Sequence, residues 1–162
     1  MDGVQVAEAT KIILPFPDFG PSTRFISQGY GVPDDKRLHI DAVSLYVDLR
    51  DTHHAPPEKA IAFLLTGDLE TEEGRMPVRE PIGTLEWLDR SGPPWIGTTT
   101  GFLRSTLATF IDDGLRVVFV MKEHIELGSA AGGTPLSHAV VLGRLVERPH
   151  AARPEGAEAL PQ

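Results

Sequence analysis

Hydrophobic and polar residues alternate most regularly between Trp95 and Leu127, and this alternation predicts β-strands. Two arms rich in Thr, Val, Ile and Phe meet at Asp112-Asp113-Gly114, where glycine would supply the positive φ of a tight turn, so we predict one long antiparallel hairpin. The inward set of the second arm is apolar and consists of Val117, Phe119, Met121, Ile125 and Leu127. Glu123 falls within this set. A carboxylate among apolar side chains is costly unless it is paired, hydrogen-bonded or protonated, so Glu123 is a candidate functional residue.

The same alternation continues on both sides of this hairpin. It predicts strands at residues 38–50, 60–70, 80–89 and 137–148, a short strand at 24–28, and an edge strand or apolar arm at 11–16. No window keeps a helical period, and three consecutive threonines favour a strand where Leu103, Leu107 and Phe110 have helix-like spacing. Long antiparallel strands must stack or close to hide their edges. We therefore expect an all-β fold, a single antiparallel β-barrel of about eight strands enclosing an apolar cavity large enough for one small ligand.

The chain has 162 residues, which fits one domain with a substantial core. We expect this domain to span residues 1–148, with an N-terminal arm or lid at 1–33. The Gly-rich stretch at 128–135 predicts a turn, and the Pro/Ala/Glu-rich composition of 149–162 predicts a disordered tail.

Charge and composition exclude several classes of protein. The net charge is -8 and no basic run exceeds two residues, so neither nucleic acid nor a membrane surface is expected as a partner. The absence of cysteine excludes disulfides and thiolate chemistry. No signal peptide or membrane-spanning apolar run is recognisable, which predicts a soluble cytoplasmic protein.

Common catalytic and metal-binding motifs are also missing. His53 and His54 are adjacent, so their side chains point apart, and no third ligand follows at a suitable spacing; we read them as a solvated loop and expect no metal. The chain has no G-x-S-x-G motif, and no helix follows the glycines of 128–133, which disfavours a hydrolase and a phosphate-binding loop.

The segments IGTTTGFLR and GLRVVFVMKEHIEL, separated by a turn, resemble the small β-barrel cyclases that form spirotetronates in bacterial polyketide pathways, which are natural Diels-Alderases. Those cyclases are similar in turn to the allene oxide cyclase and dirigent barrels, which share a Gly-x-x-x-Gly strand before a long hairpin. The resemblance covers about thirty-five of the 162 residues, around 96–127 with the turn included, and one clear strand follows here where the cyclases carry most of their barrel. It implies a hydrophobic cavity that holds a linear polyketide-like substrate in a reactive shape, without metal, cofactor or covalent intermediate.

This resemblance, combined with the strand pattern, gives a set of candidate site residues. Glu123 would act as general acid/base or as a hydrogen-bond anchor. Asp41 and His39 are predicted to share a face with Val43, Leu45 and Val47, which would place them either beside Glu123 as catalytic residues or at a wet barrel mouth. The candidate substrate-binding residues are Tyr46, Phe63, Trp87, Trp95, Phe102, Arg104, Phe119 and Met121. Either Arg104 or Arg144 could pair with Glu123.

Three functions follow as alternatives. The first is a ring-forming enzyme of bacterial natural-product biosynthesis that acts on a hydrophobic small molecule. The second is a lipocalin-like carrier that binds such a molecule without changing it. The third is a structural or interaction barrel with a filled core. A homodimer is compatible with each of them.

Overall fold

The computed structural model describes residues 7–49, 60–71, 76, 78–88, 95–101 and 110–149. These ranges form strands and turns, and they contain no helix that could span a membrane. The all-β prediction is therefore confirmed for the described residues. The strands are β1 (Glu8–Pro15), β2 (Ser22–Ile26), β3 (Tyr30–Gly31), β4 (Lys36–Leu49), β5 (Ile61–Thr66), β6 (Val78–Thr84), β7 (Glu86–Trp87), β8 (Trp95–Gly101), β9 (Gly114–Ile125) and β10 (His138–Glu147).

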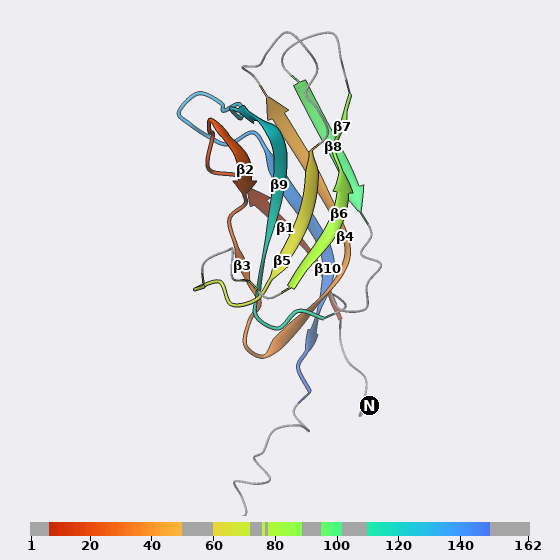
Figure 1. The fold of residues 1–162 in the computed structure, drawn as a ribbon. Coiled ribbons are helices and arrows are strands. Elements are labelled where there is room, and N and C mark those ends of the chain that lie inside the picture. Colours follow the sequence, from red (N-terminus) through yellow and green to blue (C-terminus); the bar gives the residue numbers. More distant parts are fainter. Residues whose placement is uncertain are drawn as a thin grey trace, which may run out of the picture.

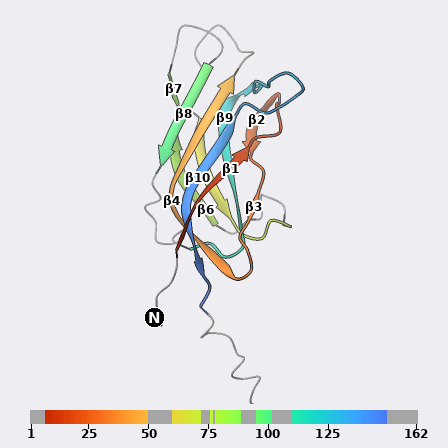
Figure 2. The same ribbon diagram turned by 180° about the vertical axis from the view of Figure 1, so that it is seen from behind.

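The strands form two antiparallel sheets that pack face to face (Figures 1 and 2). Sheet A has the order β1-β10-β4-β8-β7, and sheet B has the order β2-β9-β5-β6, with β3 also paired to β9. Among the described strands neither sheet closes on itself. The described fold is thus a two-sheet sandwich, in which residues from the facing sides of both sheets form one core.

The predicted hairpin between residues 95 and 127 is wrong, because its two arms lie in different sheets. β8 pairs with β4 and β7 in sheet A, whereas β9 pairs with β2, β3 and β5 in sheet B. Ile111 and Leu38 exchange two backbone hydrogen bonds of 2.8 and 2.9 Å, and the chain then turns into sheet B. Gly114 does not have a positive φ at this turn; a Cβ there would collide with the side chain of Leu69.

The core is built around Phe119 of β9. Its ring packs edge-on against Phe16, with centroids 5.0 Å apart, and stacks on Phe25 at 5.1 Å. The predicted inward set of this strand is confirmed, because all of its members are buried: Val117, Phe119, Met121, Ile125 and Leu127. Burying one such side chain stabilises the fold by about 1.5–3 kcal/mol.

A second, smaller core covers part of the outer face of sheet B. Leu65, Met76 and Val118 are buried there, and the partly buried side chains that pack on them are Ile26, Phe63 and Leu69. The isobutyl group of Leu69 lies over three glycines, Gly29, Gly31 and Gly114, which we call the Leu69 socket. The turn after β5 is therefore fastened to β3 and β9 by one apolar side chain.

A β-bulge in β4 changes which residues of that strand face the core. Leu142 pairs with Ala42 and Gly143 pairs with Ile40, which leaves Asp41 as an extra residue. Before the bulge Leu38 and Ile40 belong to the core, whereas after it the core positions of this strand are Val43, Leu45, Val47 and Leu49. His39 and Asp41 therefore do not share the face of Val43, as predicted, but lie on the outer side of sheet A.

The N-terminal segment is an edge strand rather than a free arm where the structure describes it. β1 pairs with β10 along all eight of its residues, and Ile12 and Leu14 are buried. The turn predicted at 128–135 is confirmed: Gly132 and Gly133 have positive φ, and Ser129 and Pro135 form a β-bridge. His53, His54 and the predicted tail from 150 onward lie outside the described residues.

Candidate functional site

Four of the predicted substrate-binding residues lie together in the core. Trp87, Trp95, Phe119 and Met121 are buried and belong to one apolar cluster. The Trp87 ring packs against Gly97 of the neighbouring strand. Only glycine leaves room for it there, because a Cβ at Gly97 would approach Trp87 Cζ3 to 2.5 Å. At Phe119 the space between the sheets is filled by Phe16 and Phe25 rather than left for a ligand.

Glu123 lies near the end of β9 and is half-buried. Arg24 pairs with Val120 and Ser22 pairs with Ile125, so Met121 to His124 oppose the single residue Thr23. This irregularity explains how a carboxylate fits between two buried residues of the same strand, Met121 and Ile125. In the part of the chain that the structure describes, no hydrogen bond or ion pair holds the Glu123 carboxylate.

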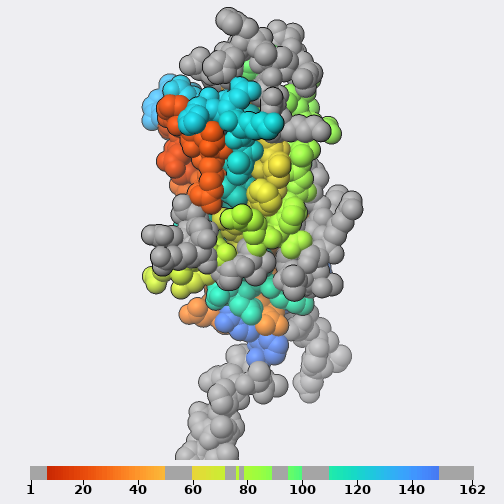
Figure 3. All heavy atoms as spheres, viewed as in Figure 1, coloured from red at the N-terminus to blue at the C-terminus, as the bar shows by residue number. Residues whose placement is uncertain are grey.

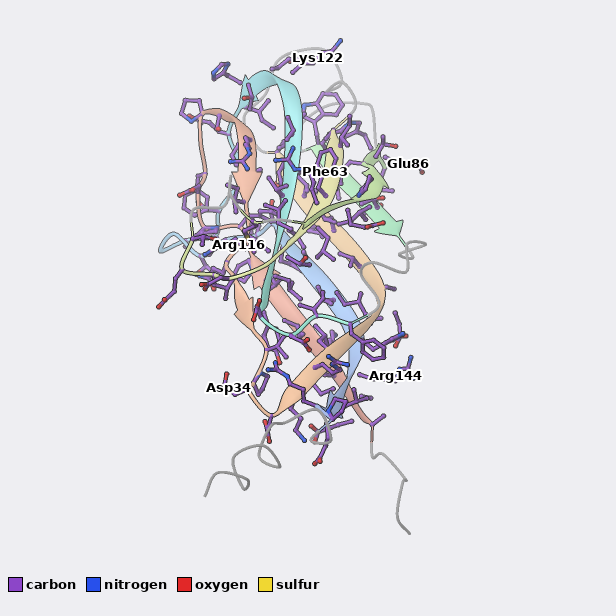
Figure 4. All side chains as sticks on the ribbon, turned by 60° about the horizontal axis from the view of Figure 1, so that its bottom comes forward. Asp34, Phe63, Glu86, Arg116, Lys122 and Arg144 are labelled. Atoms are coloured by element: carbon purple, nitrogen blue, oxygen red, sulfur yellow. The ribbon has the colours of Figure 1, made fainter. Side chains whose placement is uncertain are left out.

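The other predicted catalytic residues, His39 and Asp41, form an exposed cluster with Arg144 on the outer face of sheet A. Arg144 is labelled in Figure 4. Arg144 Nη2 lies 3.2 Å from Asp41 Oδ1 and 2.8 Å from His39 Nδ1, and Arg144 Nε lies 3.4 Å from Asp41 Oδ2. The guanidinium can only donate, so His39 Nδ1 is the acceptor and a neutral His39 carries its proton on Nε2. Arg144 thus pairs with Asp41 and not with Glu123, the alternative partner that the sequence allows. Arg104 lies outside the described residues.

This cluster continues toward the start of β4 through Phe110. The His39 ring meets Phe110 edge-on with centroids 5.4 Å apart, and the Arg37 guanidinium lies 5.3 Å from the centre of the same ring. Arg37 donates two hydrogen bonds of 3.0 Å to Asp112, and this bonding holds the pKa of the Asp112 carboxyl below its ordinary value. In this cluster the two described carboxylates, Asp41 and Asp112, are each paired with an arginine.

The last two described candidates point away from the core on opposite sides. Tyr46 stacks on its cross-strand neighbour His138 on the outer face of sheet A, with centroids 5.6 Å apart. Phe63 lies on the outer face of sheet B, where the Arg79 guanidinium is 5.7 Å from its ring centre (Figure 4). Because the core separates these two faces, one ligand cannot contact both rings. Phe102 lies outside the described residues.

Sequence reasoning missed an apolar patch on the outer face of sheet A. Ile13 of β1 is 58% exposed and lies beside Val140 of β10, and Leu142, 42% exposed, lies beside Lys11. The signal was present in the sequence, because Ile12-Ile13-Leu14 and Val140-Val141-Leu142 place apolar side chains on both faces of their strands.

An acidic groove of about 220 Å³ lies at the end of the sandwich near β3. Its lining consists of Gly31, Val32, Asp34, Asp68, Leu69, Asp112 and Asp113. Arg37 and Arg148 already neutralise Asp112, and the described ranges contain no group of three His, Asp or Glu side chains placed to hold a metal.

No protein-family model matches the chain, and no curated protein matches it significantly.

Proposed function

We propose that this protein is a binding domain, in which a sandwich filled by its own side chains presents the outer face of sheet A to a partner. The observation that carries this proposal is the packing of Phe119 between Phe16 and Phe25 at the centre of the molecule. A domain that works by enclosing a ligand keeps such a position open, whereas a domain that binds with its surface packs it.

The outer face of sheet A has the composition of a binding surface. Ile13 and Leu142 expose apolar area, Tyr46 is 36% exposed, and the paired charges of Asp41 and Arg144 border them. Interfaces commonly combine an apolar centre with an aromatic residue and a polar rim.

The substitution Phe119→Ala tests whether the core is filled. Loss of a tightly packed phenylalanine leaves a cavity, so we expect a loss of about 3–5 kcal/mol in the free energy of unfolding, measured by urea denaturation. Val120→Ala is the matched control, because Val120 is the neighbouring residue of the same strand and is exposed; its effect should stay within about 0.5 kcal/mol.

Ligand uptake provides the second arm of this test. Native mass spectrometry with palmitate and with a linear polyene should show no saturable one-to-one complex. A complex of that stoichiometry, together with a Phe119→Ala variant that is nearly as stable as the wild type, would contradict the proposal and favour a carrier.

The ring-forming enzyme is a second candidate, and the position of Glu123 supports it. A half-buried carboxylate between Met121 and Ile125 could serve as the single polar anchor of an apolar site. This candidate includes closure of the two sheets into one barrel of about eight strands around a cavity. Two contacts between the sheets favour such closure: Gln28 N donates to Pro15 O at 2.9 Å, and a Cβ at Gly83 of β6 would lie 3.3 Å from Thr99 Oγ1 of β8.

Incubation with a linear polyene precursor separates the two candidates. Turnover that falls on the order of 10²-fold or more in Glu123→Gln, with binding kept, would establish acid/base chemistry at this residue. Binding with an unchanged ligand would indicate the carrier, and the absence of both is the result expected for the binding domain.

A further inference from the structure

We infer that the free edge of β1 docks an extended peptide segment of a partner protein, which joins sheet A as an additional antiparallel strand. The segment places an acidic side chain opposite Lys11 and an apolar side chain opposite Ile13. This inference rests on the proposed binding function and specifies its site and its class of partner.

Backbone geometry determines which groups of β1 are free. Phe16 N donates to Ser137 O at 3.0 Å, so the even-numbered residues of this strand point their N–H and C=O groups at β10. The odd-numbered residues point away from it, as the hydrogen bond from Gln28 N to Pro15 O confirms. Ala9, Lys11 and Ile13 therefore direct their backbone groups at the open edge (Figure 2), where no described residue pairs with them.

The side chains of the same residues lie on the outer face of the sheet. Lys11 is exposed, and no ion pair holds it among the described residues. Ile13 lies opposite Val140 of β10, and Lys11 lies opposite Leu142 of the same strand. An incoming strand thus meets unsatisfied backbone groups, an apolar surface and one positive charge, which are the features that strand addition uses for affinity and specificity.

Charge favours a different chain over a second copy of this one. Two copies of β1 pairing across a two-fold axis would join odd-numbered residues to odd-numbered residues, because only these have free backbone groups. Lys11 would then oppose Ala9, Lys11, Ile13 or Pro15, and never a carboxylate, since Glu8 is even-numbered. A peptide with a Glu or Asp at this position satisfies the ammonium group that a homodimer leaves unpaired.

Two synthetic peptides test the inference. Acetyl-Thr-Val-Thr-Glu-Thr-Val-Thr-amide can place its first Val opposite Ile13 and its Glu opposite Lys11, and the control peptide carries Lys in place of Glu. Titration calorimetry should show tighter binding of the Glu peptide by about threefold to tenfold. In Lys11→Glu this preference should reverse, because the charges across the new pair are exchanged.

Proline substitutions test whether the backbone edge is used. Ile13→Pro removes an N–H that points at the open edge, so the fold should be kept and Glu-peptide binding should fall at least tenfold. Ile13→Ala controls for the lost side chain and should bind more tightly than Ile13→Pro. Ile12→Pro breaks the ladder with β10 instead and should destabilise the protein.

Two outcomes would overturn the inference. One is the failure of the wild type to prefer the Glu peptide: either it binds both peptides equally, or it binds neither and hydrogen exchange at Ala9, Lys11 and Ile13 is unchanged when peptide is added. The other is a dimer in sedimentation experiments that Ile13→Pro dissociates, which would assign the edge to a second copy. If the peptides fail while Phe119→Ala behaves as expected for a filled core, only the docking site is lost and the proposed function stands.

Discussion

The two outer faces of the sandwich differ in how the chain treats their apolar side chains. On sheet B, whose outer face is turned toward the viewer in Figure 3, Met76 and Leu69 pack with Leu65 and Val118, which are only 1% and 2% exposed. On sheet A, Ile13 and Leu142 remain in contact with solvent. Covering a face stabilises the fold by about 25 cal/mol for each Å² of apolar surface removed from water. The difference teaches that the apolar residues in the covered part of sheet B, Leu65 and Val118, stabilise the fold. The exposed apolar residues of sheet A would gain the same stabilisation only if a partner covered them.

The largest test of this comparison removes one leucine from each face. Leu65→Ala should lower the free energy of unfolding by about 2–5 kcal/mol, because it opens a cavity in the small core. Leu142→Ala should change it by no more than about 0.5 kcal/mol. Urea denaturation of both variants measures the contrast, and equal losses would mean that the face of sheet A is covered as well.

A smaller effect is expected at the Leu69 socket, where the turn after β5 contacts β3 and β9. Gly114→Ala should destabilise the protein by about 1–3 kcal/mol, because its Cβ collides with Leu69. Gly31→Ala is the matched control: its Cβ would lie 3.7 Å from Leu69 Cδ1, an ordinary contact. Leu69→Ala should relieve the collision in a double variant, and a double variant whose loss is the sum of the two single losses would refute the socket.

On sheet A, the pair of Arg37 and Asp112 should respond to pH. The guanidinium lowers the pKa of Asp112 in the folded state, so its stabilisation is present above the unfolded-state pKa and is lost as pH falls through the lowered value. Asp112→Asn should cost about 1 kcal/mol at pH 7, a value limited by solvent screening of a partly exposed pair. The difference from wild type in thermal unfolding should begin to shrink as pH falls below about 4, the ordinary pKa of Asp, and should be lost once the lowered folded-state pKa is passed. A difference that persists to pH 2 would assign the loss to packing instead.

The smallest effect is expected at the stacked rings of Tyr46 and His138. A double-mutant cycle with alanine at both positions should give a coupling of about 0.2–1 kcal/mol, as for other cross-strand pairs. If the face of sheet A is a binding surface, these variants keep the fold and change partner affinity instead. A coupling above 2 kcal/mol would show that the rings are part of the structural core.

The sequence predicted which residues form strands better than it predicted their neighbours. Alternation identified β4, β9 and β10 nearly to their ends, because period two is a local property of the chain. It could not reveal that β8 and β9 belong to different sheets, since strand pairing is decided by the contacts of distant segments. The Asp-Gly turn misled for the same reason: the glycine at 114 is explained by Leu69, forty-five positions earlier.

Side-chain facing was predicted correctly where the pairing is regular and wrongly where it is bulged. Phe119 and Met121 face the core as expected, but the extra residue Asp41 reverses the alternation of β4. A signal for this reversal exists in the adjacent apolar pair Ala42-Val43, where the buried positions change from even to odd numbers. The pairing of Arg144 with Asp41 had no such signal, because it depends on the register between β4 and β10.

The pairing of β1 with β10 also has a consequence for synthesis and for engineering. Of the described strands, β1 is synthesised first, yet its described partner in sheet A is β10, the last of them, so β1 waits on the order of ten seconds at normal elongation rates. Until then its apolar residues are open to chaperones.

The same pairing brings Glu8 next to Leu145, so a short linker could join the two ends of the fold and new termini could be opened in the turn at 128–135. In such a permutant β10 would directly precede β1 in the chain. The two strands could then pair as a hairpin as soon as both have been synthesised.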